Sequence, residues 1–310
     1  MMWNRSLSTI RDIMLEFARR TGLVDDRQPQ RYLWTDAFAV CNFLELRRRT
    51  DDEAYEALAL RLVNQVHHTL GQHRRDDPRS GWISGLDPEL AEEHPTRGGL
   101  RIGKDLPERK SGEPLDPHLE WERDGQYYHY LTKWMQVLNR VSCVVGNRTY
   151  NRWAMELAQT AHDRFTYQPS NGSRKRMFWK MSIDLSSPLV SSMGQHDPLD
   201  GLITYQELQA AAPRKAAWPD LSEEIEEMEP LCEERRWVTE DALGIGGLLT
   251  DAYRLAQLVA RENIEQSDLL EQLLDASAQS LRTYTKGMGY EQPLRFRLAF
   301  RELGLVIGLQ

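Results

Sequence analysis

The sequence predicts an all-α fold built from consecutive helical hairpins. Apolar residues recur at intervals of three and four over most of the 310 residues, as on the buried face of amphipathic helices. Runs of β-branched residues with a period of two are nearly absent. Several of the expected helices also share one opening pattern, in which an acidic residue and a small residue precede an apolar stretch, as in Asp36-Ala37, Asp124-Gly125, Asp200-Gly201 and Asp241-Ala242.

The apolar spacing predicts the helices in order along the chain. The first carries the stripe Ile10, Ile13 and Phe17, and Gly71 is a plausible C-cap for the third. The expected helices cover residues 10–18, 35–46, 52–70, 125–145, 150–165, 199–211, 222–233, 241–261, 267–284 and 294–307. Segments 100–102 and 177–183 are candidates for one short β-hairpin.

The helices that follow the shared opening are rich in aromatic or small residues, and most precede a more polar amphipathic helix. Such a series suits an inner ring packed on all sides and an outer ring that faces water on one side. We therefore expect a single domain over residues 1–310, an α/α toroid of about five to six helical hairpins.

Residues 72–123 interrupt the helical order. A segment of this length without helical periodicity is far longer than an ordinary loop, so it is either disordered or functional. Its tryptophans and its Gly-Leu-Arg-Ile-Gly core around Arg101 favour an ordered lid-like insertion. A phosphate-binding loop is disfavoured, because the spacing differs from the P-loop pattern and no strand precedes it.

Charge and cysteine usage restrict the class of partner. The formal net charge of -8 argues against a nucleic-acid partner. No apolar run reaches the length of a membrane span, and no signal peptide is visible. Three widely spaced cysteines fit a reducing cytoplasm, so we expect a cytoplasmic protein. No motif predicts a metal site or another cofactor.

The aspartates that open the helices have two interpretations. Asp36, Asp124 and Asp200 are expected either to cap their helices or to place carboxylates around one mouth of the ring. A cap contributes about 1 kcal/mol and requires no function.

The densest polar and aromatic segment is 120–134. It contains Trp121, Gln126, Tyr127 and His129, a mixture that suits a sugar-like ligand, since rings stack on a pyranose and polar groups contact its hydroxyls. Aromatic packing between inner helices is the alternative.

Two further segments carry candidate residues. His196, between Gln195 and Asp197, is expected to shuttle protons or to fix its loop by a hydrogen bond. The alternation in 176–184 predicts an extended segment with Trp179 and Lys180 on opposite faces.

The hairpin repeat and the openings Trp34-Thr35-Asp36 and Arg123-Asp124-Gly125 resemble those of the six-hairpin glycosidase-like superfamily, the (α/α)6 toroids. This superfamily includes unsaturated glucuronyl hydrolases and, more distantly, the N-acylglucosamine 2-epimerase group. The resemblance implies that a saccharide binds at the mouth formed by the inner helices.

The first functional hypothesis is a glycoside hydrolase with paired carboxylates. Asp124 is the expected general acid, because its aromatic surroundings would raise its pKa, and Asp36 or Asp200 is the expected partner. The remaining expected site residues, which contact the saccharide, are Trp34, Trp121, Tyr127, Trp179, Gln126, His129, His196, Lys180 and Arg101.

Two alternatives stay open. One is a sugar epimerase or isomerase with His196 and His129 as an acid–base pair. The other is a non-catalytic helical scaffold or ligand-binding protein in which the aspartates are only caps. The apolar segment 303–309 is either part of the last buried helix or a contact in a homodimer.

Overall fold

The computed structural model describes residues 2–25, 27–110, 112–190, 192–213, 215, 217–233, 235–262, 264–287, 293 and 297–310. The chain forms two compact units, residues 1–193 with 211–221 and residues 194–210 with 222–310. The prediction of one domain over 1–310 stays a prediction. Among the described residues no helix is both long and apolar enough to cross a bilayer.

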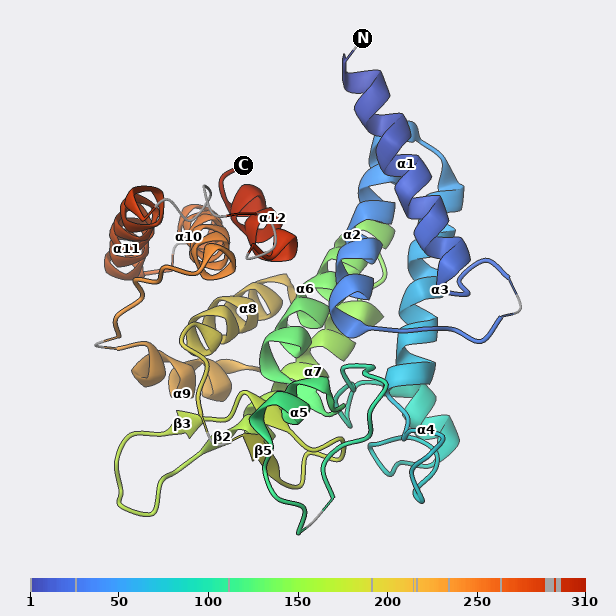
Figure 1. The fold of residues 1–310 in the computed structure, drawn as a ribbon, viewed down its shortest axis with the longest axis horizontal. Helices are drawn as coiled ribbons and strands as arrows, with labels where there is room; N and C mark the ends of the chain where they lie inside the picture. Colours follow the sequence, from blue (N-terminus) through green and yellow to red (C-terminus); the bar gives the residue numbers. More distant parts are fainter. Residues whose placement is uncertain are drawn as a thin grey trace. The chain divides into compact units, whose positions relative to one another are not determined.

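Unit 1 is helical with two small sheets (Figure 1). Its helices are α1 (Met2–Arg20), α2 (Leu33–Thr50), α3 (Glu53–Leu70), α4 (Pro88–Glu93), α5 (Pro117–Glu122), α6 (Tyr128–Val145) and α7 (Thr149–Phe165). Its strands are β1 (Gln126–Tyr127), β2 (Thr166–Tyr167), β3 (Arg176–Met177), β4 (Lys180–Met181) and β5 (Pro188–Val190). Helices α2 and α3 pack as one hairpin, α6 and α7 pack as another, and α2 also packs against α6.

The hairpin helices bury their apolar stripes against each other. Phe43 of α2, Leu62 of α3 and Trp134 of α6 are fully buried. Asp52 caps α3 by accepting a hydrogen bond from the backbone N–H of Ala54, and Gly71 ends that helix as predicted. The pairing of α2 with α6 matters for the site, because it brings the beginnings of two helices with aromatic openings into one part of the unit.

The sheets differ from the predicted hairpin. Strand β4 pairs with β1 on one side and β5 on the other, and β2 pairs with β3. Segment 100–102 is not a strand, although the backbone N–H of Ile102 donates to the carbonyl of Gly125. The predicted helix over 125–145 begins only at Tyr128, because Gln126 and Tyr127 are extended and pair with Met181 and Lys180.

Unit 2 contains α8 (Asp197–Ala211), α9 (Ser222–Cys232), α10 (Ala242–Glu262), α11 (Ser267–Lys286) and α12 (Ala299–Gly308). Helix α10 packs against α11 and α12 (Figure 1). Asp241 caps α10 by accepting from the backbone N–H of Gly244, at 2.9 Å. The expected helix over 294–307 lies partly outside the described residues, and α12 covers its last part. Leu305 is buried there while Leu303 is exposed, and the homodimer stays a prediction.

Candidate functional site

Aromatic rings from four segments of unit 1 meet in one cluster. Trp34 comes from the first turn of α2, Tyr127 and His129 from the β1–α6 junction, Trp179 from the residue before β4, and Trp121 from α5. The His129 ring stacks on Tyr127 with centroids 5.4 Å apart and an interplanar angle of 14°. The other contacts along the cluster are Trp34–His129 at 6.0 Å, Tyr127–Trp179 at 5.2 Å and Trp121–Trp179 at 4.8 Å between centroids. The sequence predicted all five residues as site residues, and we call this group the aromatic cluster.

The aromatic cluster is accessible from solvent. Trp121 is 55% exposed, and Trp34, His129 and Trp179 are half-buried, whereas Tyr127 is buried beneath them. A single exposed indole is common, but ring faces from several segments that gather in one exposed patch are typical of an interaction site. The cluster therefore offers apolar ring faces with an imidazole among them, which is the chemistry of a site for a ligand with both apolar and polar faces.

Two tyrosines that the sequence analysis did not select belong to this group. The hydroxyls of Tyr32 and Tyr130 are hydrogen-bonded at 2.8 Å, and Tyr130 also contacts the rings of Trp34 and Tyr127. Burial raises the pKa of Tyr130 and of Tyr32, so both are neutral near pH 7. Tyr32 is close in sequence to Trp34, and Tyr130 directly follows His129, so their positions beside predicted site residues could have identified them.

Two lysines flank the buried Tyr127 ring. The ammonium groups of Lys104 and Lys180 lie 5.3 and 5.4 Å from its centroid. Lys180 is fully buried and donates to the Glu120 carboxylate at 2.9 Å, while Trp179, which directly precedes β4, is half-buried. Both side chains lie against the Tyr127 ring, and their placement on opposite faces stays a prediction. Burial lowers the pKa of both lysines. Lys180 was expected to contact a saccharide, but its ammonium group is occupied inside the protein.

Asp124 anchors the 72–123 segment. Its carboxylate is fully buried and accepts from Arg101 at 2.6 Å, from Arg74 at 3.3 Å and from the backbone N–H groups of Gly103 and Lys104 at 2.9 and 3.3 Å. Both oxygens are thus used as acceptors: Oδ2 accepts from the two guanidinium groups and Oδ1 from the two backbone N–H groups. These contacts differ from those expected of a general acid, which holds a proton to donate.

Arg101 and Gln126 hold the same segment. The Arg101 guanidinium also donates to the carbonyls of Gln72 and Thr69, both at 2.8 Å. The Gln126 amide is fully buried; it accepts from Leu100 and donates to Gly98 and Ile183. A saccharide would have to displace these hydrogen bonds to reach either side chain, so the contacts favour a structural role for both residues.

Asp36 lies in the first turn of α2, next to Trp34. Its side chain is 1% exposed, accepts from the backbone N–H of Tyr32 at 3.0 Å and lies 3.7 Å from the buried Arg31 guanidinium. Burial outweighs the attraction of Arg31 and raises the pKa of Asp36 to about 7. Asp36 is thus a buried carboxyl group that exchanges its proton near neutral pH.

The raised pKa of Asp36 makes stability depend on pH. The folded state binds this proton more tightly than the unfolded chain, so the resulting stabilisation is complete below pH ~4 and is lost as the pH rises through about 7. We expect the free energy of unfolding of the wild type to fall on the order of 2–4 kcal/mol relative to Asp36→Asn between pH 4 and 8. Urea denaturation across this range measures it. The exposed cap variant Asp52→Asn is the control, and parallel profiles for wild type and Asp36→Asn would contradict the assignment.

The remaining candidates belong to unit 2. The Nε2–H group of His196 donates to the carbonyl of Trp237 at 3.0 Å, which is the loop-fixing contact that the sequence offered as one alternative. Burial lowers the pKa of His196. Asp200 pairs at 3.0 Å with the buried Arg254, which also binds Asp251 and Glu207. Asp36 and Asp124 are in unit 1, so the carboxylate pairs predicted with Asp200 stay predictions.

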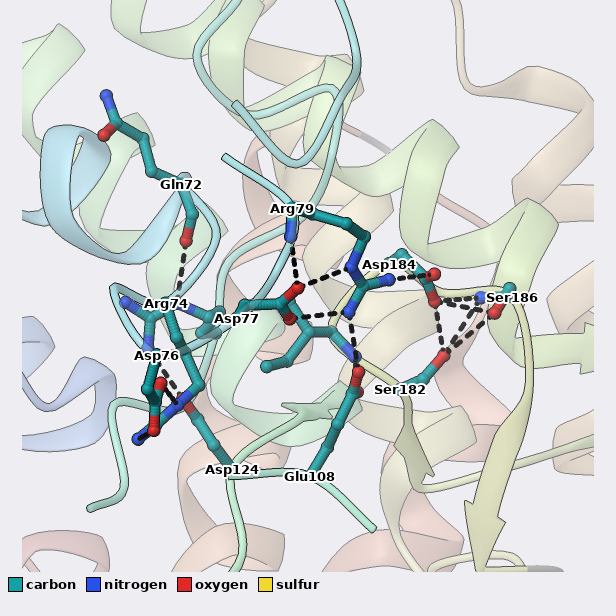
Figure 2. Close-up of polar contacts among 12 residues, drawn as sticks. Gln72, Arg74, Asp76, Asp77, Arg79, Glu108, Asp124, Ser182, Asp184 and Ser186 are labelled. Carbon is teal, nitrogen blue, oxygen red and sulfur yellow. Dashed lines mark hydrogen bonds and ion pairs between the residues drawn. The ribbon is translucent and has the colours of Figure 1, made fainter. Parts of the chain in front are cut away.

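A second polar cluster, missed in the sequence, surrounds Arg79 (Figure 2). Its guanidinium donates to Asp77, Glu108 and Asp184, at 2.8, 2.8 and 2.5 Å in the ion pairs. The hydrogen bond from Arg79 lowers the pKa of Asp77 to about 2, against a smaller opposing effect of burial. Arg79 lies in a segment without periodicity, and its partners are distant in sequence, so no local pattern pointed to it.

The fold is similar to that of cellobiose 2-epimerase from Spirochaeta thermophila. The TM-score is 0.50 at 15% sequence identity, and the likeness covers 89% of this chain and 72% of that chain. No model of a protein family matches the sequence, and no curated protein matches it. The comparison confirms the predicted fold class: the chain is mostly helical with small antiparallel sheets, and its fold resembles that of an (α/α)6 toroid epimerase.

Proposed function

We propose that the chain binds a saccharide at the aromatic cluster and isomerises it next to its carbonyl carbon. The observation that carries the proposal is the stacking of His129 on Tyr127 among half-exposed tryptophans. Flat ring faces bind the apolar face of a pyranose, and an imidazole beside them accepts and donates protons near neutral pH.

His129 is the acid–base residue in this proposal. It removes the proton from the carbon next to the carbonyl of the open-chain sugar and leaves an enediolate. A solvent water molecule then delivers a proton to the other face of that carbon, which yields the epimer, and the imidazolium returns its proton to solvent. Trp34, Trp121 and Trp179 hold the sugar so that this carbon lies beside the imidazole. The likeness in fold to cellobiose 2-epimerase supports this reaction over others by analogy.

Reducing disaccharides and their methyl glycosides separate the candidate reactions. Epimerisation requires a free reducing end, so we expect a new epimer from cellobiose or another reducing disaccharide in a panel, and no product from the methyl glycoside. In D2O, the proton next to the carbonyl exchanges with solvent, which NMR detects. A hydrolase instead releases monosaccharides from both. If no saccharide in the panel binds or reacts, the proposal fails.

Replacement of Trp121 tests the aromatic cluster directly. Because Trp121 is 55% exposed, Trp121→Ala removes a ligand surface at little cost in folding. We expect the saccharide affinity to fall about tenfold, equivalent to about 1.4 kcal/mol. Isothermal titration calorimetry measures it, with Trp218→Ala as the control, since Trp218 is half-buried and bonds to Asn151 outside the cluster. Equal losses in both variants would contradict the assignment.

Glycoside hydrolysis is the second candidate, and one observation favours it. Asp36, with its pKa of about 7, has the protonation behaviour of a general acid and lies two residues from Trp34. Asp36 is nearly fully buried and accepts a hydrogen bond from the backbone N–H of Tyr32, which favours epimerisation as the first candidate.

A further inference from the structure

The turn that joins β4 to β5 contains a strained residue. Leu185 has a φ of 57°, in the left-handed region that non-glycine residues rarely adopt, and its side chain is buried. The turn closes through the Ser182 N–H, which donates to the carbonyl of Ser187 at 2.9 Å, and the Leu185 N–H, which donates to that of Ser182. A conformation of this kind persists only where the surroundings hold it.

Part of that support lies within the turn. The Asp184 carboxylate accepts from the hydroxyls of Ser182 and Ser186 at 2.8 and 2.7 Å and from the backbone N–H of Ser186 at 3.1 Å. These bonds use Oδ1 and leave Oδ2 to point away from the turn, where it accepts from Arg79 (Figure 2).

The rest of the support comes from the 72–123 segment through Arg79. Its Nη1 donates to Asp184, and its Nη2 donates to Glu108, whose other oxygen accepts from the backbone N–H of Ile183 at 2.6 Å. Asp77 fixes the guanidinium itself by accepting from its Nε and Nη2 at 2.9 and 2.8 Å. One side chain thus bridges three carboxylates, and two of these hold the strained turn.

The turn determines which residues β4 presents to the aromatic cluster. The turn fixes the register of β4 against β5, which is shifted between Lys180 and Met181, and β4 pairs with β1 along its other edge. In the observed register Lys180 pairs with Tyr127 and is buried, while the Trp179 carbonyl accepts from the Tyr128 N–H at 3.1 Å and its ring contacts Tyr127. Loss of the turn's conformation would displace β4 against β1 and move Trp179 out of the cluster.

We propose that Arg79 is a positioning residue for the saccharide site: it holds the 182–187 turn in the conformation that keeps Trp179 in the aromatic cluster. The assignment rests on the proposed saccharide-binding function for its effect on ligand, but its effect on Trp179 is independent of any ligand. Arg79 contacts no ring of the cluster among the described interactions, so it acts through β4.

The test combines a spectroscopic signature with ligand affinity. The indoles of Trp121 and Trp179, 4.8 Å apart, are close enough to couple, so circular dichroism reports their contact without ligand. We expect Arg79→Ala to lose this signal and to bind saccharide at least about tenfold more weakly at temperatures well below its Tm. Asp184→Ala should act in the same direction, and the double variant should lose less than the sum of the two single losses, because the two side chains share one contact.

Arg48→Ala is the control, since Arg48 is exposed and bonds to Glu45 within α2. If Arg79→Ala does not fold, Arg79→Lys provides the comparison. Lysine keeps the positive charge but has a single ammonium nitrogen in place of the planar guanidinium group. An unchanged indole signal in the folded variant overturns the assignment. If the wild type binds no saccharide, the proposed function fails, and the indole signal alone decides whether Arg79 positions Trp179.

Discussion

Asp124→Ala is expected to lower the free energy of unfolding by about 3–5 kcal/mol, because it leaves buried guanidinium charge without a partner. Asp124 is fully buried, and Arg101, with which it pairs at 2.6 Å, is 7% exposed. The same change also leaves the N–H groups of Gly103 and Lys104 without their acceptor. Chemical denaturation with circular dichroism measures the effect.

Two comparisons separate this role from capping and from catalysis. Asp52→Ala, at the exposed cap of α3, should cost only about 1 kcal/mol. The double change Arg101→Met with Asp124→Leu should destabilise less than Asp124→Ala alone, because it removes both charges together. A loss near 1 kcal/mol for Asp124→Ala would indicate a simple cap. Full stability with abolished turnover in Asp124→Asn would instead support the general acid that the sequence suggested.

His129→Asn is expected to reduce epimerisation about 10²- to 10⁴-fold, the usual contribution of a positioned acid–base group. Asparagine preserves polarity and much of the ring's shape, so the saccharide affinity should change by only a few-fold. The rate of solvent proton exchange into the sugar, followed by NMR, measures the catalytic step. Calorimetry on the same variant measures binding.

His68→Asn is the matched control for His129. His68 is partly exposed and bonds to Glu92 and the carbonyl of Asn64, away from the aromatic cluster. Its replacement should leave turnover unchanged. If the turnover of His129→Asn stays within about threefold of the wild type, His129 does not transfer the proton. That result would favour a mechanism that uses a carboxylate.

The helices and the aromatic members of the site were predictable because both depend on local spacing. Three of the five cluster residues come from one dense segment: Trp121, Tyr127 and His129. Trp34 lies in the first turn of α2. A helical period determines which residues face inward without reference to the rest of the chain.

The roles of the polar residues were not predictable in the same way. Asp124 is bound by Arg101 and Arg74, which are 23 and 50 residues away, so nothing near it in sequence distinguishes an ion-paired anchor from a general acid. Arg79 reaches Asp184 across 105 residues. The burial of Lys180 and Gln126 also depends on how the 72–123 segment packs over them. That segment has no hydrophobic periodicity from which its packing could be predicted.

The division of the chain into two units has a consequence for biosynthesis. Unit 1 includes residues 211–221, which follow α8, and α8 belongs to unit 2 up to residue 210. During translation α8 therefore emerges well before α10, whose Arg254 pairs with Asp200 and donates to Thr204 of α8. Leu199, Ile203 and Leu208 of α8 are fully buried in the native protein, so they are exposed until the elements that cover them have been made. We expect the nascent chain at this stage to be the point at which chaperones are most needed.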